Sequence, residues 1–166
     1  MSRILVTGNA GSGKSTLARK IASSHNLPFY SLDKIVWKEK WQKASTNDIL
    51  QKTNELISND SWVIDGVSYE VMAAADLVIF LDVPRRTSYW RTTKRNYRYL
   101  FRSRPELPPH CPEIFIIPKL IKIIWNFPRK VRPRILDAKT QRNESFVHIT
   151  SNKELAEYLN SLHISS

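Results

Sequence analysis

The stretch that decides the fold is Gly-Asn-Ala-Gly-Ser-Gly-Lys-Ser at residues 8–15. It follows an apolar run at residues 4–6 and leads into a helical pattern that begins at Thr16. The chain has 4 glycines, and all but Gly66 lie in this stretch. Such a turn between a strand and a helix aims backbone N–H groups at one anion, and the helix N-terminus adds partial positive charge. The spacing is that of a phosphate-binding P-loop.

The side chains at the end of the P-loop have expected roles toward a nucleoside triphosphate. Lys14 is expected to reach the β- and γ-phosphates as a point charge, and the Ser15 hydroxyl to take one coordination position of Mg²⁺. Thr16 is expected to face the α-phosphate. The predicted cofactors are therefore ATP and Mg²⁺, although no side chain specific for adenine can be read from the sequence.

Length and composition favour a single domain over residues 1–166. A chain of this size with 42% hydrophobic residues can build one sizeable core. We see no secretory signal and no apolar run long enough to span a bilayer, so we expect a cytoplasmic protein without a membrane partner. Cys111 is the single cysteine, which fits a reducing compartment and argues against a zinc site.

The formal net charge is +11, and the excess is concentrated in the second half. Two basic clusters carry it: Arg85, Arg86, Arg91, Lys94, Arg95, Arg98, Arg102 and Arg104, and then Lys119, Lys122, Arg129, Lys130, Arg132 and Arg134. Such a charge suits either polyphosphate nucleotides or a nucleic-acid backbone.

Short apolar segments alternate with helical patterns along the chain. Strands are expected at residues 3–7, 29–32, 62–65, 77–81 and 146–149. Helices are expected at 14–25, about 45–59, about 69–75, from 85 onward, and after the capping box at 151–154. Strands that are apolar on both faces and separated by helices indicate a buried parallel sheet in an α/β fold.

The basic segment between the fourth and fifth strands, at about residues 85–135, is expected to be a mobile insertion. Prolines are expected to cut it into several short helices; they are Pro105, Pro108, Pro109, Pro112, Pro118, Pro128 and Pro133. The apolar, lysine-bearing stretch at 114–125 is expected to pack over the nucleotide pocket rather than on a membrane surface.

Further motifs extend along nearly the whole chain: Leu32-Asp33 followed by Trp37 and Trp41, residues 62–66 and 80–84, Trp125-Asn126-Phe127-Pro128, and Arg132-Pro133. With residues 8–16, they make the chain resemble the nucleoside monophosphate kinase group of P-loop proteins. It is more closely similar to bacterial proteins known as DNA topology modulation or adenylate kinase-related proteins. The resemblance implies a three-layer P-loop NTPase fold, a five-stranded parallel sheet in the order 2-3-1-4-5, and a helical lid after the fourth strand.

The resemblance also implies roles for three side chains. In such kinases the acid that ends the third strand lies near Mg²⁺, which points to Asp65. A carboxylate at the carboxyl end of a strand beside the P-loop strand faces the ligand crevice, although an Asp-Gly turn is the alternative. By resemblance, Arg91 packs on the adenine ring and touches phosphate, and Arg95 contacts the transferring phosphoryl group. The expected nucleotide ligands are thus Gly8, Gly11, Ser12, Gly13, Lys14, Ser15, Thr16 and Arg91.

Other candidates have two interpretations each. Asp33 could orient or deprotonate an acceptor hydroxyl, or cap the following turn. Trp37 and Trp41 are either a stacking wall or, as we favour, part of the core. Asp82 also ends a strand; it could belong to the site or, as we favour, cap the helix that follows Pro84.

Arginines beyond the lid are further candidates. Arg132 and Arg134 could form a second clamp on phosphate, although no spacing rule fixes them. Every other arginine of the segment is expected to lie on a solvated, generally basic face.

These observations favour an ATP-dependent phosphotransferase that acts on a small acceptor, such as a nucleotide or nucleoside, with Lys14, Arg91, Arg95 and Asp33 as catalytic residues. Adenylate kinases carry Phe-Pro-Arg after the Asp-Gly, whereas this chain has Val-Ser-Tyr at 67–69, so AMP is a doubtful acceptor. The alternative is a nucleotide-gated protein that binds DNA through its basic half. An ATPase without an acceptor is disfavoured because a lid excludes water.

Overall fold

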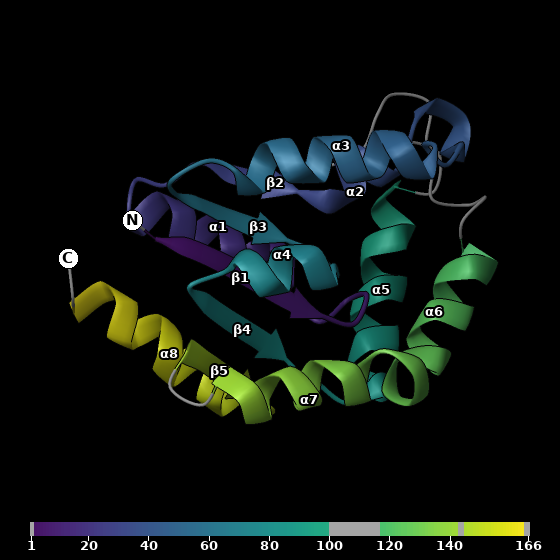
Figure 1. Ribbon diagram of the computed structural model, residues 1–166. Helices are drawn as coiled ribbons and strands as arrows, with labels where there is room; N and C mark the ends of the chain where they lie inside the picture. The colour runs from purple at the N-terminus through teal and green to yellow at the C-terminus, as the bar shows by residue number, and fades with distance from the viewer. Residues whose placement is uncertain (1, 100–116, 143–144, 165–166) are drawn as a thin grey trace.

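The computed structural model describes residues 2–99, 117–142 and 145–164, with side chains described for all of these except 95–99 and 162–164. Its centre is a parallel sheet (Figure 1). The strands are β1 (Arg3–Gly8), β2 (Phe29–Ser31), β3 (Trp62–Asp65), β4 (Leu77–Leu81) and β5 (Phe146–Ile149). Their order is β2-β3-β1-β4-β5, which confirms the predicted fold class and topology.

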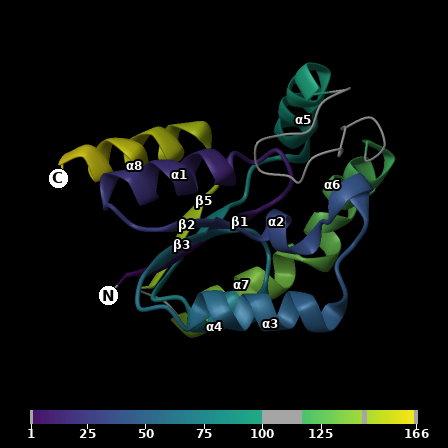
Figure 2. The same cartoon turned by 90° about the horizontal axis from the view of Figure 1, so that it is seen from above.

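Helices cover both faces of the sheet and make a three-layer fold. They are α1 (Lys14–Ser24), α2 (Leu32–Val36), the 3₁₀ turn η1 (Glu39–Trp41), α3 (Thr46–Ile57), α4 (Tyr69–Ala74), α5 (Arg85–Tyr99), α6 (Ile117–Lys130), α7 (Arg132–Arg142) and α8 (Asn152–Ile164). Helices α1 and α8 lie together on one face, and α3, α4 and α7 lie on the other (Figure 2). The short helix α2 and the turn η1 were not predicted.

Alternation along the central strand divides the core into two halves. Ile4 and Val6 of β1 point to the α1 side, where they pack with Leu17 and Ile21. Leu5 points to the opposite side and belongs to the cluster around Phe80. Because both faces are apolar, the strand is buried from Ile4 to its end at Gly8, as expected for a parallel sheet covered by helices.

The segment expected to be an insertion contributes to this core. Phe127 of α6 and Ile135 of α7 belong to the same buried cluster as Phe80, and Ile135 is fully buried. Helices α6 and α7 are thereby part of the packed domain. Residues 100–116, with Cys111 and four of the prolines, lie outside the described residues.

Prolines 118 and 133 each lie at the second position of a helix, where a missing N–H costs little. Pro128 lies inside α6, so the predicted break at this residue is wrong. A proline cannot donate to the carbonyl four residues earlier, which here belongs to Ile124. The side-chain amide of Asn9 in the P-loop donates to that carbonyl at 3.2 Å and satisfies it. The helix therefore continues through Pro128 and is tied to the P-loop.

Among the helices that the described residues form, none has the length and apolar character needed to cross a membrane.

Candidate functional site

The P-loop runs from the end of β1 to the first turn of α1. Gly11 and Gly13 have φ angles of 74° and 99°, in the left-handed region that favours glycine. The Ser12 N–H donates to the Asn9 carbonyl at 3.2 Å and closes the loop. The first amides of α1, from Lys14 onward, have no helical carbonyl one turn earlier to bind. These N–H groups and the helix N-terminus form the expected anion site.

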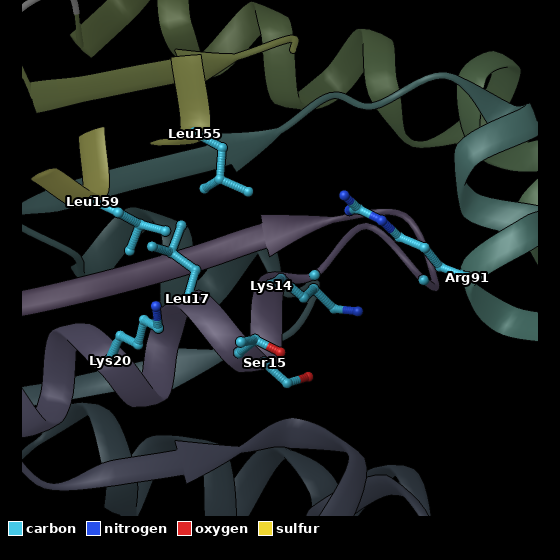
Figure 3. A pocket seen from close by; sticks show the side chains of 10 residues that line it. Lys14, Ser15, Leu17, Lys20, Arg91, Leu155 and Leu159 are labelled. Carbon is cyan, nitrogen blue, oxygen red and sulfur yellow. The ribbon is translucent and has the colours of Figure 1, made fainter. Parts of the chain in front are cut away.

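A cavity of about 380 Å³ opens at this loop (Figure 3). Its walls are formed by Gly11, Gly13, Lys14, Ser15, Thr16, Leu17, Lys20, Arg91, Leu155 and Leu159. Five of the predicted nucleotide ligands, residues 11 and 13–16, line it together with Arg91. Gly8 ends β1 and Ser12 is fully buried, and neither of these two lines the cavity.

Four cavity residues, Leu17, Lys20, Leu155 and Leu159, were missed by the sequence reasoning. Leu17 and Lys20 belong to the helix that follows the P-loop, and Leu155 and Leu159 belong to α8. They meet because α8 packs beside α1, a contact between segments more than a hundred residues apart. The amphipathic pattern of α8 was a signal for packing, but not for packing at the nucleotide site.

Arg91 reaches from α5 to the P-loop. Its Nη1 donates to the Ser12 carbonyl at 2.7 Å, and its Nη2 donates to Asn152 Oδ1 at 2.8 Å. Figure 3 shows its side chain extending from α5 toward the loop that carries Lys14. The backbone of Arg95 lies one turn further along the same helix, and its side chain is outside the description.

Helix α5 packs directly on the loop at Gly11. A Cβ at this position would lie 2.5 Å from the Ser88 carbonyl and would overlap Thr92 Oγ1. Ser88 is fully buried and Thr92 is 5% exposed, so the contact is dry. The loop therefore needs glycine here for close approach as well as for its φ angle.

Asp65 ends β3 at the carboxyl edge of the sheet. Its residue is 2% exposed, and it pairs in register with Val6 of β1 and Ser31 of β2. The following Gly66 N–H donates to the Val6 carbonyl at 3.2 Å. The carboxylate is thus buried beside the strand that leads into the P-loop, and it is not among the residues that line the 380 Å³ cavity.

Asp33 lies in the first turn of α2, two residues after the end of β2, and is half-buried. Trp37 and Trp41 form an edge-to-face pair with ring centroids 5.5 Å apart. Neither ring belongs to the buried core, so the prediction that they are core residues is wrong. Lys119 Nζ lies 4.1 Å from the Trp37 ring centroid, so α6 meets the segment after α2. The Trp37 ring therefore has a cation on its face as well as the Trp41 ring at its edge.

A second cavity of about 280 Å³ lies between α2, α3 and the start of α4. Its lining includes Leu32, Ile35, Ile49, Val67, Ser68, Tyr69 and Glu70. The Ser68 hydroxyl donates to Glu70 at 2.6 Å, and this hydrogen bond holds the pKa of the Glu70 carboxyl below its usual range. The Arg134 guanidinium lies 5.6 Å from the centroid of the Tyr69 ring. This cavity opens beside the carboxyl end of β3.

The prediction that Asp82 caps α5 is wrong. Its carboxylate accepts from Arg132 Nε at 2.9 and 3.0 Å, and His148 Nε2 lies 2.9 Å from Oδ2. The His148 ring stacks on Phe80 with centroids 5.3 Å apart. Arg132, a candidate second phosphate clamp, is therefore paired with an acid that joins α7 to the ends of β4 and β5.

Among the side chains that the structure describes, no group of three from His, Cys, Asp or Glu could hold a metal ion. A divalent cation at this site would depend on Ser15, on one carboxylate and on ligand phosphates.

Comparisons with known proteins agree with this architecture. The 1.7 Å crystal structure of shikimate kinase from Bacteroides thetaiotaomicron aligns with a TM-score of 0.54, at 19% identity over 97% of this chain and 96% of that one. Shikimate kinase from Acinetobacter baumannii in complex with shikimate gives 0.52, at 20% identity over 99% and 94%. A gluconokinase from Sinorhizobium meliloti 1021 gives 0.50, at 15% identity over 99% and 97%. At these identities the likeness shows the fold, which is that of the P-loop kinases.

None of the curated proteins compared with this chain matches it significantly. A family profile described as "AAA domain" matches residues 4–99, which include the P-loop, Asp65 and Arg91. This match spans more than half of the chain, and the chain therefore belongs to the AAA domain family, with a P-loop kinase fold.

Proposed function

We propose that the protein is a Mg²⁺-dependent phosphotransferase that moves the γ-phosphoryl group of ATP to a hydroxyl of a small acceptor. The observation that carries this proposal is one cavity in which the P-loop, Lys14, Ser15 and Arg91 meet. Gly11 and Gly13 at positive φ shape the loop, and three cations, Lys14, Lys20 and Arg91, border the cavity. These residues fit a triphosphate.

Ser15 and Asp65 would hold the Mg²⁺ that accompanies ATP, the hydroxyl directly and the buried carboxylate through water. When bound, the ion supplies charge neutralisation at the β- and γ-phosphate oxygens. Lys14 would hold the same phosphates from the P-loop side, and Arg91 from α5.

In the proposed reaction, an acceptor oxygen forms a bond to the γ-phosphorus while the bond from that phosphorus to the β–γ bridging oxygen breaks and ADP leaves. Asp33 would orient the acceptor hydroxyl and take its proton. Fixed positive charge from Lys14, Arg91 and Arg95 would stabilise the charge that develops on the transferring group.

The acceptor side is proposed to be the region of Asp33 and the 280 Å³ cavity. Structural neighbours include a shikimate kinase in complex with shikimate and a gluconokinase, and both of these names point to small hydroxylated acceptors. We extend only the chemical class to this chain, together with nucleosides. We also propose that the enzyme is of the adenylate kinase-like type, that it is related to the topology modulation proteins, and that it is cytoplasmic.

The test is ADP release from purified protein with ATP·Mg²⁺ and a panel of nucleosides, nucleotides and small polyols or hydroxy acids. An acceptor that accelerates ADP release would support the proposal. Lys14→Ala should lower that rate by at least about 100-fold and leave the fold intact by circular dichroism. Lys153→Ala, at an exposed position of α8, is the matched control and should behave as wild type. Normal turnover by Lys14→Ala would contradict the assignment.

A further inference from the structure

The Arg91 guanidinium has two hydrogen-bond partners among the described residues. What these partners do rests on the proposed function, since they determine how Arg91 is presented to ATP. One arm of the guanidinium binds the Ser12 carbonyl and the other binds the side-chain oxygen of Asn152, at 2.7 and 2.8 Å. The three residues come from the P-loop, α5 and α8. Asn152 is the first residue of α8 and is exposed.

Both of these acceptors are neutral oxygens. In the part of the chain whose side chains are described, no carboxylate forms an ion pair with Arg91. Arg132 shows the contrast, because its charge is paired with Asp82 at 2.9 Å. A guanidinium held by neutral oxygens is fixed in direction but keeps its whole charge for a ligand anion.

The acid nearest to Asn152 in the sequence, Glu154, is bound elsewhere. Glu154 lies only two residues after Asn152, but its carboxylate accepts from the Thr150 N–H at 2.8 Å and from the Thr150 hydroxyl at 2.9 Å. These hydrogen bonds hold the pKa of Glu154 below its usual range, so it stays ionised and bound to Thr150. The side chain that meets Arg91 is an amide, of nearly the same shape as a carboxylate but without its charge.

We propose that Asn152 is a positioning residue for ATP binding: it orients the Arg91 guanidinium over the P-loop without neutralising it. Helix α8 thereby takes part in the nucleotide site through a polar contact, in addition to the apolar contacts of Leu155 and Leu159. The absence of charge on residue 152 is the property that matters for ATP binding. A purely structural role at a helix N-terminus would be served at least as well by aspartate.

The test compares Asn152→Ala and Asn152→Asp in ATP·Mg²⁺ binding, measured by calorimetry without any acceptor. Asn152→Ala frees the guanidinium and should weaken binding about threefold, whereas Asn152→Asp pairs it with a carboxylate and should weaken binding about tenfold. The aspartate variant should nevertheless melt at or above the wild-type temperature, because an acid in the first turn of a helix is stabilising. A purely structural role predicts the opposite order in binding.

Asn160→Asp is the matched control, since it adds the same charge at an exposed position two turns along α8 and should bind ATP·Mg²⁺ as wild type does. A double-mutant cycle completes the design. In an Arg91→Ala background, Asn152→Asp should cause no further loss if it acts through Arg91. Wild-type affinity in Asn152→Asp, or an equal loss in both backgrounds, would overturn the inference and leave the proposed function standing. A wild-type protein that does not bind ATP·Mg²⁺ would overturn both.

Discussion

Three arginines show how the partner of a side chain decides its role. Arg91 is held by two neutral oxygens at the P-loop, Arg132 is paired with Asp82, and Arg142 donates to the carbonyls of Ala73 and Ala75 at 2.8 and 2.7 Å. Only the first keeps both its charge and a place in the nucleotide cavity. The three arginines are equivalent in a count of basic residues. Such a count therefore could not distinguish an arginine that binds phosphate from one that forms a structural ion pair.

Gly11 provides a prediction at the same scale. Gly11→Ala places a Cβ against the Ser88 carbonyl and forces alanine into the left-handed region at φ 74°. Together these should lower the free energy of unfolding by about 2–4 kcal/mol, since α5 must move off the loop. Chemical denaturation would measure the loss. Asn59→Ala, at an exposed helix end, is a surface control and should lose less than half as much. An unchanged stability for Gly11→Ala would show that α5 does not pack on the loop.

At the scale of elements, the hydrogen bond from Asn9 to Ile124 joins the P-loop to α6 through a carbonyl that Pro128 leaves without a helical donor. Asn9→Ala should leave that buried carbonyl unpaired and cost about 1–3 kcal/mol of unfolding free energy. In a Pro128→Ala background the helix regains an N–H for the same carbonyl, so Asn9→Ala should cost distinctly less.

Urea denaturation of wild type, the two single variants and the double variant measures this coupling. Asn126→Ala, which removes a side-chain bond to the Lys122 carbonyl on the same helix, is the control and should cost the same with or without Pro128. Equal costs of Asn9→Ala in both backgrounds would mean that Pro128 does not create the need for Asn9.

For the whole molecule, the sheet could be predicted because each strand is a short apolar run followed by a helix, and its order followed from the resemblance. The position of residues 11 and 13–16 also followed from one motif. The contributions of Leu155, Asn152 and Lys20 to the nucleotide site could not be predicted. Leu155 and Asn152 reach the site only because α8 packs beside α1, and Lys20 of α1 lines the cavity that the two helices share. The contact between Trp37 and Lys119 likewise depends on the tertiary placement of α6.

Nucleotide binding should also be visible in the stability of the whole domain. A ligand that binds only the folded state at about 100 times its dissociation constant adds about 2.7 kcal/mol. For a domain of this size, that corresponds to a rise in Tm of roughly 5–10 °C. Differential scanning calorimetry with ATP·Mg²⁺ measures the rise. Chelation of Mg²⁺ should reduce it, because the phosphates then repel one another and are no longer linked to Ser15 through the ion. Lys14→Ala should show a much smaller rise at the same ligand concentration, since it removes the cation that is proposed to hold the β- and γ-phosphates. An equal rise in Lys14→Ala would place ATP outside the P-loop cavity and would remove the basis of the proposed phosphotransfer.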